Sequence, residues 1–125
     1  MPTAEDEKQQ QAQEQTLILE AEQYHRHVHT HSGVTSVDKA HVHEHPGVTG
    51  IAQGIGNSHL HRIWGATSFV RGHFHMYEGD TSPAIMVGEG YHTHYVRLRT
   101  SFNDGHSHTI MGFVEPLGRE MMVEQ

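Results

Sequence analysis

The chain carries the pattern His-x-His six times, and imidazole is the side chain that proteins use most often to ligate transition metals. Two histidines separated by one residue point to the same face of a β-strand, about 6.6 Å apart along the backbone. Two or three such residues can therefore converge on one ion when strands lie side by side. The pattern predicts metal sites built from these candidate ligands: His27, His29, His41, His43, His59, His61, His73, His75, His92, His94, His106 and His108.

The donor set limits which metals such sites could hold. The chain has no cysteine, which excludes disulfides, thiolate zinc sites and iron–sulfur clusters. Ligation by imidazole nitrogen alone suits zinc, copper or nickel, whereas calcium and magnesium prefer oxygen ligands. We therefore expect the cofactor to be a divalent transition metal, namely zinc, copper or nickel.

The histidine pairs belong to a longer internal repeat. Six residues after the first histidine of a copy the chain has glycine, at Gly33, Gly47, Gly65, Gly79 and Gly112, with Leu98 in the fifth copy. Eight residues after it the chain has threonine, at Thr35, Thr49, Thr67, Thr81 and Thr100, with Val114 in the sixth copy. All fixed positions are an even number of residues apart, which indicates strands, because alternate residues of a strand share a face. We expect the glycines to mark a bulge or a close backbone approach, and the threonine hydroxyls to bond across the sheet or to orient an imidazole.

The distances between copies alternate between short and long. Successive copies begin 14, 18, 14, 19 and 14 residues apart, and the last short link contains Asp104-Gly105, a tight-turn signal. Alternation of this kind suits antiparallel strands whose turns fall at opposite ends. We predict an all-β fold, a six-strand antiparallel meander or small barrel of three hairpin repeats, with a β-solenoid as the alternative. In the hairpin fold the first, third and fifth pairs would gather at one end and the other three pairs at the opposite end, whereas a solenoid would stack all six pairs in one ladder.

Composition divides the chain into three parts. Residues 1–24 are rich in Glu, Gln and Ala and predict a helical or extended N-terminal arm, residues 25–114 hold the His-x-His repeat β domain, and residues 115–125 form a C-terminal tail. The only apolar patch of the arm is Leu17–Leu19, and it is either solvated or docks on its own domain or a neighbouring subunit. We therefore expect a homo-oligomer or filament that assembles through the arm.

The overall composition limits the function further. The hydrophobic share of 34% lies below the usual range of about 45–50%, so we expect bound metal to help stabilise a small core. The net charge of −7 gives no basic footprint for nucleic acid, and no apolar run is long enough for a membrane span. The segment Met1–Lys8 has no basic or apolar signal-peptide region, which indicates a cytoplasmic protein, with non-classical export or extracellular assembly left open.

Two segments, Thr67–His75 and Thr100–His108, resemble the YmaF-like family, small bacterial proteins with repeated Thr-Ser/Thr-Phe-x-x-Gly-His-x-His units. A weaker third unit, Thr35–His43, has Ala40 in the glycine place. The resemblance covers about residues 27–114 and implies a grouping more than a function. Leu98 and Val114 depart from the repeat in the last two copies.

These observations favour a multi-site metal-binding protein that is not an enzyme. One alternative is a metalloenzyme with a single differentiated tri-histidine site, and the segment His73–Glu78 is faintly similar to the His-x-His and glutamate pattern of cupin enzymes. A second alternative is a structural assembly protein whose histidine ladders hold no metal. Outside the pairs, His25, His31 and His45 are either accessory ligands or solvated.

Overall fold

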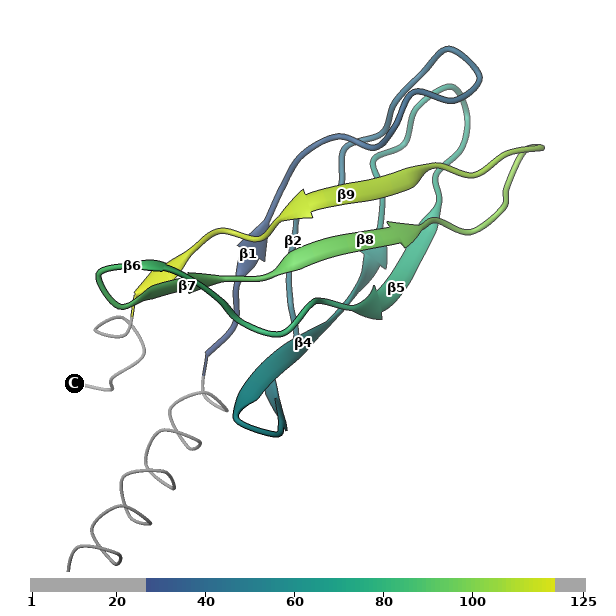
Figure 1. Cartoon of the computed structure of the whole chain (residues 1–125). Coiled ribbons are helices and arrows are strands. Elements are labelled where there is room, and N and C mark those ends of the chain that lie inside the picture. Colours follow the sequence, from purple (N-terminus) through teal and green to yellow (C-terminus); the bar gives the residue numbers. More distant parts are fainter. Residues whose placement is uncertain (1–26, 119–125) are drawn as a thin grey trace, which may run out of the picture.

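The computed structural model describes residues 27–118, which form an all-β fold of three long hairpins whose turns lie at the same end of the molecule (Figure 1). We name the hairpins by their order in the chain, as the first (27–51), second (59–83) and third (92–116) hairpins. The predicted arm (1–24) and most of the predicted tail (119–125) lie outside the described residues. Within the described residues no helix is long and apolar enough to cross a membrane.

Most of the predicted strands are divided into shorter strands by bends and isolated bridges, whereas β4 (Ser58–Ala66) is continuous. The strands are β1 (Thr30–His31), β2 (Gly47–Val48), β3 (Ala52–Ile55), β4 (Ser58–Ala66), β5 (Met76–Asp80), β6 (Ile85–Gly88), β7 (Tyr91–Thr93), β8 (Tyr95–Arg99), β9 (Thr109–Phe113) and β10 (Leu117–Gly118). They pair in the orders β1-β2, β3-β4-β5, β8-β9 and β10-β7-β6. Every pair among these described strands is antiparallel, which confirms the meander of hairpins over the solenoid, and the four sheets do not close into a barrel.

The turns of the three hairpins have the same geometry. Each turn contains two successive residues with positive φ: Lys39 (52°) and Ala40 (64°), Arg71 (50°) and Gly72 (83°), and Asp104 (54°) and Gly105 (80°). Two positive φ angles are typical of the tight hairpin turn whose twist matches that of the flanking strands, and glycine adopts the second angle without a steric cost. The turn thus explains the glycine that precedes His-x-His in two of the three copies.

Serines connect neighbouring hairpins. The backbone N–H groups of three serines donate at 2.8 Å to carbonyl oxygens on another hairpin: Ser36 to Thr109, Ser68 to Glu44, and Ser101 to Met76. These bonds join the first hairpin to the third, the second to the first and the third to the second. The hairpins therefore surround a pseudo-threefold axis.

The apolar core is small. The buried hydrophobic residues are Ala52, Ile63, Tyr77, Val96, Ile110 and Val114, six in all, whereas twelve histidines are buried among the described residues. Five of the six form one cluster, and so few buried hydrophobic residues cannot alone stabilise a domain of this size. The stability of the fold therefore depends on how the histidines are satisfied.

The repeated glycine makes room for the core. A Cβ atom on Gly65 would lie 2.7 Å from the hydroxyl oxygen of Tyr77, and one on Gly79 would lie 3.2 Å from Cδ2 of Leu98. Leu98 occupies the glycine position of its own copy, so its side chain fills space that the glycines leave open. The glycines thus permit a close approach, as expected, and the departure at Leu98 is accommodated by the core.

Candidate metal centres

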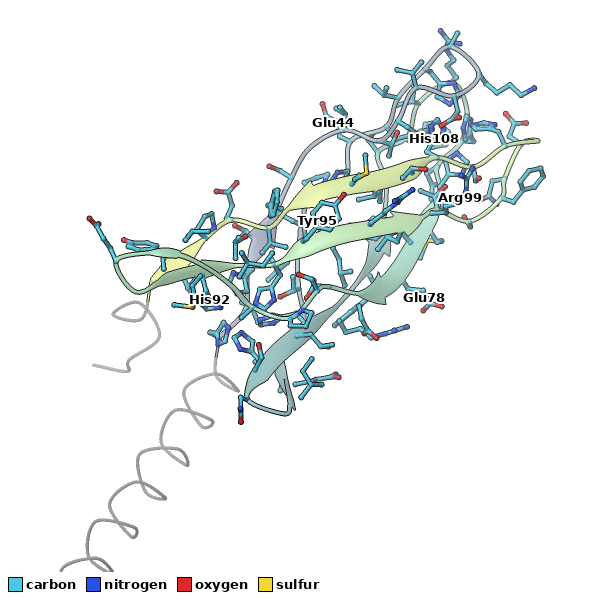
Figure 2. All side chains as sticks on the ribbon, viewed as in Figure 1. Glu44, Glu78, His92, Tyr95, Arg99 and His108 are labelled. Atoms are coloured by element: carbon cyan, nitrogen blue, oxygen red, sulfur yellow. The ribbon has the colours of Figure 1, made fainter. Side chains whose placement is uncertain are left out.

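The structure brings all twelve predicted ligands together in two groups of six. The base cluster lies at the end opposite the hairpin turns and contains His27, His29, His59, His61, His92 and His94. The tip cluster lies next to the turns and contains His41, His43, His73, His106 and His108. His75 joins it through its Nε2 atom, 3.3 Å from that of His106, and through ring contacts with other members. Figure 2 shows His92 at one end of the molecule and His108 towards the other. This is the distribution that the alternating link lengths predicted, and both clusters are positioned to hold a metal ion.

The Nε2 atoms converge on one point in each cluster. In the base cluster the Nε2 atom of His92 lies 3.1 Å from that of His29 and 3.2 Å from that of His59. In the tip cluster the Nε2 atom of His73 lies 3.1 Å from that of His43 and 3.2 Å from that of His106. The candidate ligand atoms of the six base histidines all lie within 4.8 Å of one another.

The six rings of each cluster are arranged as the corners of an octahedron. In the base cluster every pair of these described rings meets edge to face, with centroids 4.5–5.2 Å apart, except the pairs His27/His94, His29/His59 and His61/His92. In the tip cluster the centroids are 4.8–5.0 Å apart, and the exceptions are His41/His75, His43/His106 and His73/His108. In an octahedron each corner adjoins all others except the one opposite, so the exceptions are the trans pairs. An ion at the centre of nitrogen atoms spaced in this way would lie about 2.3 Å from each, slightly beyond ordinary metal–imidazole bond lengths.

Backbone carbonyls fix the second histidine of every pair. In the tip cluster the Nδ1–H group donates to a serine carbonyl of another hairpin, from His43 to Ser68 at 2.8 Å, from His75 to Ser101 at 2.9 Å and from His108 to Ser36 at 2.9 Å. In the base cluster the acceptors are the carbonyl oxygens of Glu115 for His29, Gly50 for His61 and Ser82 for His94, at 2.8–2.9 Å. Such bonds hold the proton on Nδ1 and leave the lone pair of Nε2 facing the cluster centre, the tautomer that a metal-ligating histidine needs.

The first histidines of the tip pairs are fixed locally. Their Nδ1–H groups donate to the carbonyl oxygen two residues earlier in the turn: His41 to Lys39 at 3.1 Å, His73 to Arg71 at 3.4 Å and His106 to Asp104 at 3.0 Å. These rings therefore also direct Nε2 inwards. All six members of the tip cluster present a lone pair to the same point.

This convergence has an electrostatic consequence. Two Nε2 atoms that both lack hydrogen cannot bond to each other, so the spacings of 3.1–3.3 Å place lone pair against lone pair. Among the described residues, the buried Nε2 atoms of His94 and His108 have no hydrogen-bond partner. A buried acceptor without a partner is costly, and a cation at the centre would satisfy all six at once. The donor set therefore fits a transition-metal ion.

Burial keeps the clusters neutral. Loss of solvent contact lowers the pKa of His59 to about 2, that of His94 to about 3 and those of His61 and His92 to about 4, and neighbouring imidazoles add to the effect. Burial also lowers the pKa of the tip histidines His43, His75 and His108. These rings are unprotonated at neutral pH, which is the form that binds metal.

The repeated threonines fix the backbone of the ligands. Five ligand N–H groups donate to a threonine hydroxyl at 2.9–3.1 Å: His29 to Thr49, His43 to Thr35, His61 to Thr81, His75 to Thr67 and His108 to Thr100. In the sixth copy Val114 cannot accept such a bond, but its N–H still donates to the His94 carbonyl at 3.0 Å, and the Thr93 hydroxyl donates to the Val114 carbonyl at 2.7 Å. The hydroxyls thus bond across the hairpin, as expected, and act on the main chain of the ligand more than on its ring.

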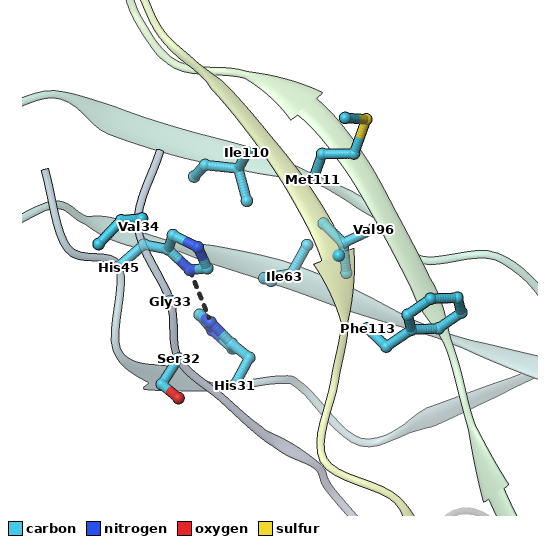
Figure 3. Close-up of a pocket in the computed structure, with 11 residues that line it drawn as sticks. His31, Ser32, Gly33, Val34, His45, Ile63, Val96, Ile110, Met111 and Phe113 are labelled. Carbon is cyan, nitrogen blue, oxygen red and sulfur yellow. Dashed lines mark hydrogen bonds between the residues drawn. The ribbon is translucent and has the colours of Figure 1, made fainter. Parts of the chain in front are cut away.

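His31 and His45 belong to neither cluster and are not solvated. They are buried at the core positions that Val96 and Ile110 occupy in the third hairpin. Their Nδ1 atoms face each other at 3.5 Å, beside a cavity of about 140 Å³ (Figure 3). Burial lowers the pKa of both rings, so they form a neutral polar pair inside the core. The remaining candidate, His25, lies outside the described residues.

Replacing this pair should leave the metal sites intact. The double variant His31→Val/His45→Ile installs the residues of the third hairpin at equivalent positions. We expect it to keep its full metal content, and its free energy of unfolding to stay unchanged or rise by up to about 2 kcal/mol, because a buried polar pair is replaced by apolar side chains. Chemical denaturation and elemental analysis of the purified variant test this, and the loss of an ion would show that the pair supports a cluster.

Comparison with known proteins agrees with the repeat. The YmaF family model, described as "Spore germination protein GerY/YamF", matches residues 11–114. The chain belongs to the YmaF family. No curated protein and no solved structure matches it.

The structure explains the unit Thr-Ser-Phe-x-x-Gly-His-x-His in this YmaF-family protein. In the unit that begins at Thr67, the threonine hydroxyl holds the His75 backbone, and the carbonyl of Ser68 accepts from His43 of the preceding hairpin. Gly72 forms the turn, and His73 and His75 enter the tip cluster. The motif therefore encodes one third of a six-histidine cluster. The sequence did not predict the carbonyl acceptors of the ligand rings, because every residue type has a backbone carbonyl.

Proposed function

We propose that this protein binds metal at several sites and that each cluster holds one divalent transition-metal ion through six imidazole nitrogens. The observation that carries the proposal is the inward convergence of Nε2 lone pairs whose Nδ1–H groups are already bonded to carbonyls. Without a cation these lone pairs repel one another in a buried space. A bound ion converts that repulsion into six favourable interactions.

Among zinc, copper and nickel, the geometry favours nickel. Structural zinc sites are almost always closed by four ligands in a tetrahedron, and copper(II) prefers a square or tetragonal arrangement. Nickel(II) readily accepts six nitrogen donors at equal distances, which is what the octahedral arrangement of each cluster offers. Zinc and copper remain competitors, because the Irving–Williams order gives copper the highest intrinsic affinity and supply decides occupancy.

The same geometry favours binding over catalysis. Six ligands complete the coordination of an octahedral ion and leave no open position for a substrate or an activated water molecule. The two clusters are also alike, whereas a metalloenzyme needs one differentiated site. The alternative of histidine ladders without metal leaves the facing lone pairs unexplained.

The family description supports a proposal about the setting of this activity. This description names spore germination, and we propose that this chain acts as a metal-binding protein in that process. We also propose a cytoplasmic location and assembly into a homo-oligomer through the arm of residues 1–24. Light scattering on the full chain and on a chain that begins at residue 25 tests the assembly, which requires that the shortened chain forms particles with fewer subunits.

Metal stoichiometry tests the proposed function directly. We expect two ions per chain by native mass spectrometry and elemental analysis of protein loaded with nickel. The variant His73→Ala/His75→Ala should keep only the base ion, and His59→Ala/His61→Ala should keep only the tip ion, because each removes two of six ligands from one cluster. The variant His31→Val/His45→Ile is the matched control, since it also replaces two buried histidines and should keep both ions. A wild-type chain that binds no ion, or a pair substitution that leaves the content at two, would refute the assignment.

A further inference from the structure

We propose that the tip cluster is the exchangeable site, through which a divalent cation is taken up and released, and that the base cluster retains its ion as a permanent part of the fold. The inference rests on the proposed function and assigns different roles to the two clusters. Both have the same ligands and the same octahedral arrangement, so the difference must come from the elements that hold them.

Three of the six base ligands, His59, His61 and His92, lie in strands of three-stranded sheets. His59 and His61 are in β4, where they pair with Gly54 and Ala52 of β3 while β5 pairs with the far end of the same strand. His92 is in β7, between β10 and β6, and pairs with Leu117 on one side and Met86 on the other. To release one of these rings, a strand must separate from its neighbours. Openings of that kind approach the cost of unfolding the domain.

The outer tip ligands lie at the ends of hairpins. His41, His73 and His106 directly follow the two-residue turns, and each is paired through a single isolated bridge, to Asp38, Val70 and Asn103 respectively. The Nδ1–H group of each ring donates to a carbonyl of its own turn. A turn that opens therefore moves the ring and its carbonyl acceptor together. It breaks side-chain contacts between turns, such as the bond from Arg71 to the Lys39 carbonyl at 3.4 Å, but the backbone hydrogen bonds of the turn residues stay within their own hairpin. Local openings of this kind cost far less than global unfolding.

Solvent access differs in the same direction. The outer base ligands His27, His59 and His92 are all buried, whereas His41 and His73 at the tip are partly exposed. The carboxylates of Asp104 and Asp38 lie 3.5 Å from His73 Nδ1 and 3.4 Å from His108 Nδ1. The basic residues Lys39 and Arg71 lie in the same turns, so charge alone does not distinguish the tip. The tip thus combines solvent access with turns that can open locally.

The inner tip ligands define the route of exchange. His43, His75 and His108 are fully buried and are anchored to serine carbonyls of neighbouring hairpins, so they stay in place while a turn opens. They form one face of the octahedron, and His41, His73 and His106 form the opposite face. The cation can therefore leave through the outer face while three nitrogens still hold it, and a new cation can be captured in the reverse order.

Isotope exchange on the full chain tests the assignment. Protein loaded with two ions of a light nickel isotope is diluted into an excess of a heavier isotope, and native mass spectrometry follows each replacement. We expect two phases, with one ion exchanging at least about tenfold faster than the other, because the tip opens at a lower free-energy cost. The variant His73→Ala/His75→Ala should lack the fast phase, and His59→Ala/His61→Ala should lack the slow phase.

A matched pair of turn variants makes the test independent of ligand removal. Gly72 at the tip (φ 83°) and Gly56 in the β3–β4 turn at the base (φ 54°) both have positive φ, and the space that a Cβ atom would occupy is open at both. A β-branched residue strains either turn to a similar extent. We expect Gly72→Val to accelerate the fast phase by about 5- to 10-fold, and Gly56→Val to leave that phase unchanged.

Each outcome separates the two proposals. Exchange of both ions at one common rate, or acceleration of the fast phase by Gly56→Val and not by Gly72→Val, would overturn the division of roles while leaving the metal-binding function in place. A chain that binds no nickel would overturn the proposed function itself. Two phases with the tip-specific response would support both.

Discussion

Removal of both ions with a strong chelator should lower the melting temperature of this protein by at least about 20 °C. An ion present at a thousandfold excess over its dissociation constant stabilises the folded state by about 4 kcal/mol, so two ions would contribute about 8 kcal/mol. For a domain of roughly this size each kcal/mol shifts the melting temperature by about 4–8 °C. The effect is large because only six hydrophobic residues are buried between residues 27 and 118, and the clusters occupy the space that a core would otherwise fill.

Thermal unfolding followed by circular dichroism measures this effect. The chelated sample should regain its melting temperature when nickel is added in excess of the chelator, which separates metal removal from damage. The variant His31→Val/His45→Ile provides a second control and should show the same chelator-dependent shift as the wild type. Equal melting temperatures with and without chelator, in a sample shown to have lost its metal, would mean that the apolar core alone sustains the fold.

Acidification from pH 6.5 towards pH 4 should unfold the protein and release its metal together. Burial holds the folded-state pKa values of His61 and His92 at about 4, whereas in the unfolded chain they titrate near 6.5. Between these values the unfolded state binds more protons than the folded state, so stability is full above pH 6.5 and falls as the pH drops. Each of the two groups then removes about 3 kcal/mol by pH 4, and His94, whose pKa is lowered to about 3, adds to the loss.

Circular dichroism and native mass spectrometry across a pH series test the coupling. We expect the loss of ellipticity and the loss of ions to share a steep midpoint between pH 6 and pH 4, because ligands must be deprotonated to hold metal. His31 and His45 also have lowered pKa values, so the variant His31→Val/His45→Ile shows how much acid sensitivity comes from outside the clusters. Retention of both ions and of the fold at pH 4 would contradict the buried, neutral state of the base cluster.

Much of the architecture could be predicted from the spacing of a few residue types. The even separation of His27, His29 and Thr35 within a copy indicated strands, and the alternation of 14 with 18 or 19 residues between copies indicated hairpins. Antiparallel order then required that His59 and His92 join the first pair at one end. The dipeptide Asp104-Gly105 marked a turn that the structure contains. These predictions were confirmed because strand periodicity and turn chemistry are local properties that the order of residues expresses directly.

Other features depend on packing between segments distant in the chain. The carbonyl acceptors of the ring protons come from residues far away in sequence, such as Ser36 for His108 and Glu115 for His29. Any residue type can supply a backbone carbonyl, so no pattern of residue types predicts these hydrogen bonds. The burial of His31 and His45 in the core could not be predicted either. Histidine occurs in proteins as a metal ligand, as a solvated side chain and as half of a buried pair, so its residue type does not decide between these.

By itself the sequence therefore determined that histidine pairs would lie on antiparallel hairpins and collect at two ends. Only the tertiary structure decided that the six imidazole rings of each cluster, three outer and three inner, occupy the corners of an octahedron. The physical reason is that period and link length fix where a strand begins and which face a side chain takes, whereas the angle at which three hairpins meet is fixed by contacts between hairpins. Those contacts, from the Ser36, Ser68 and Ser101 backbone to the core beneath them, exist only once the chain has folded.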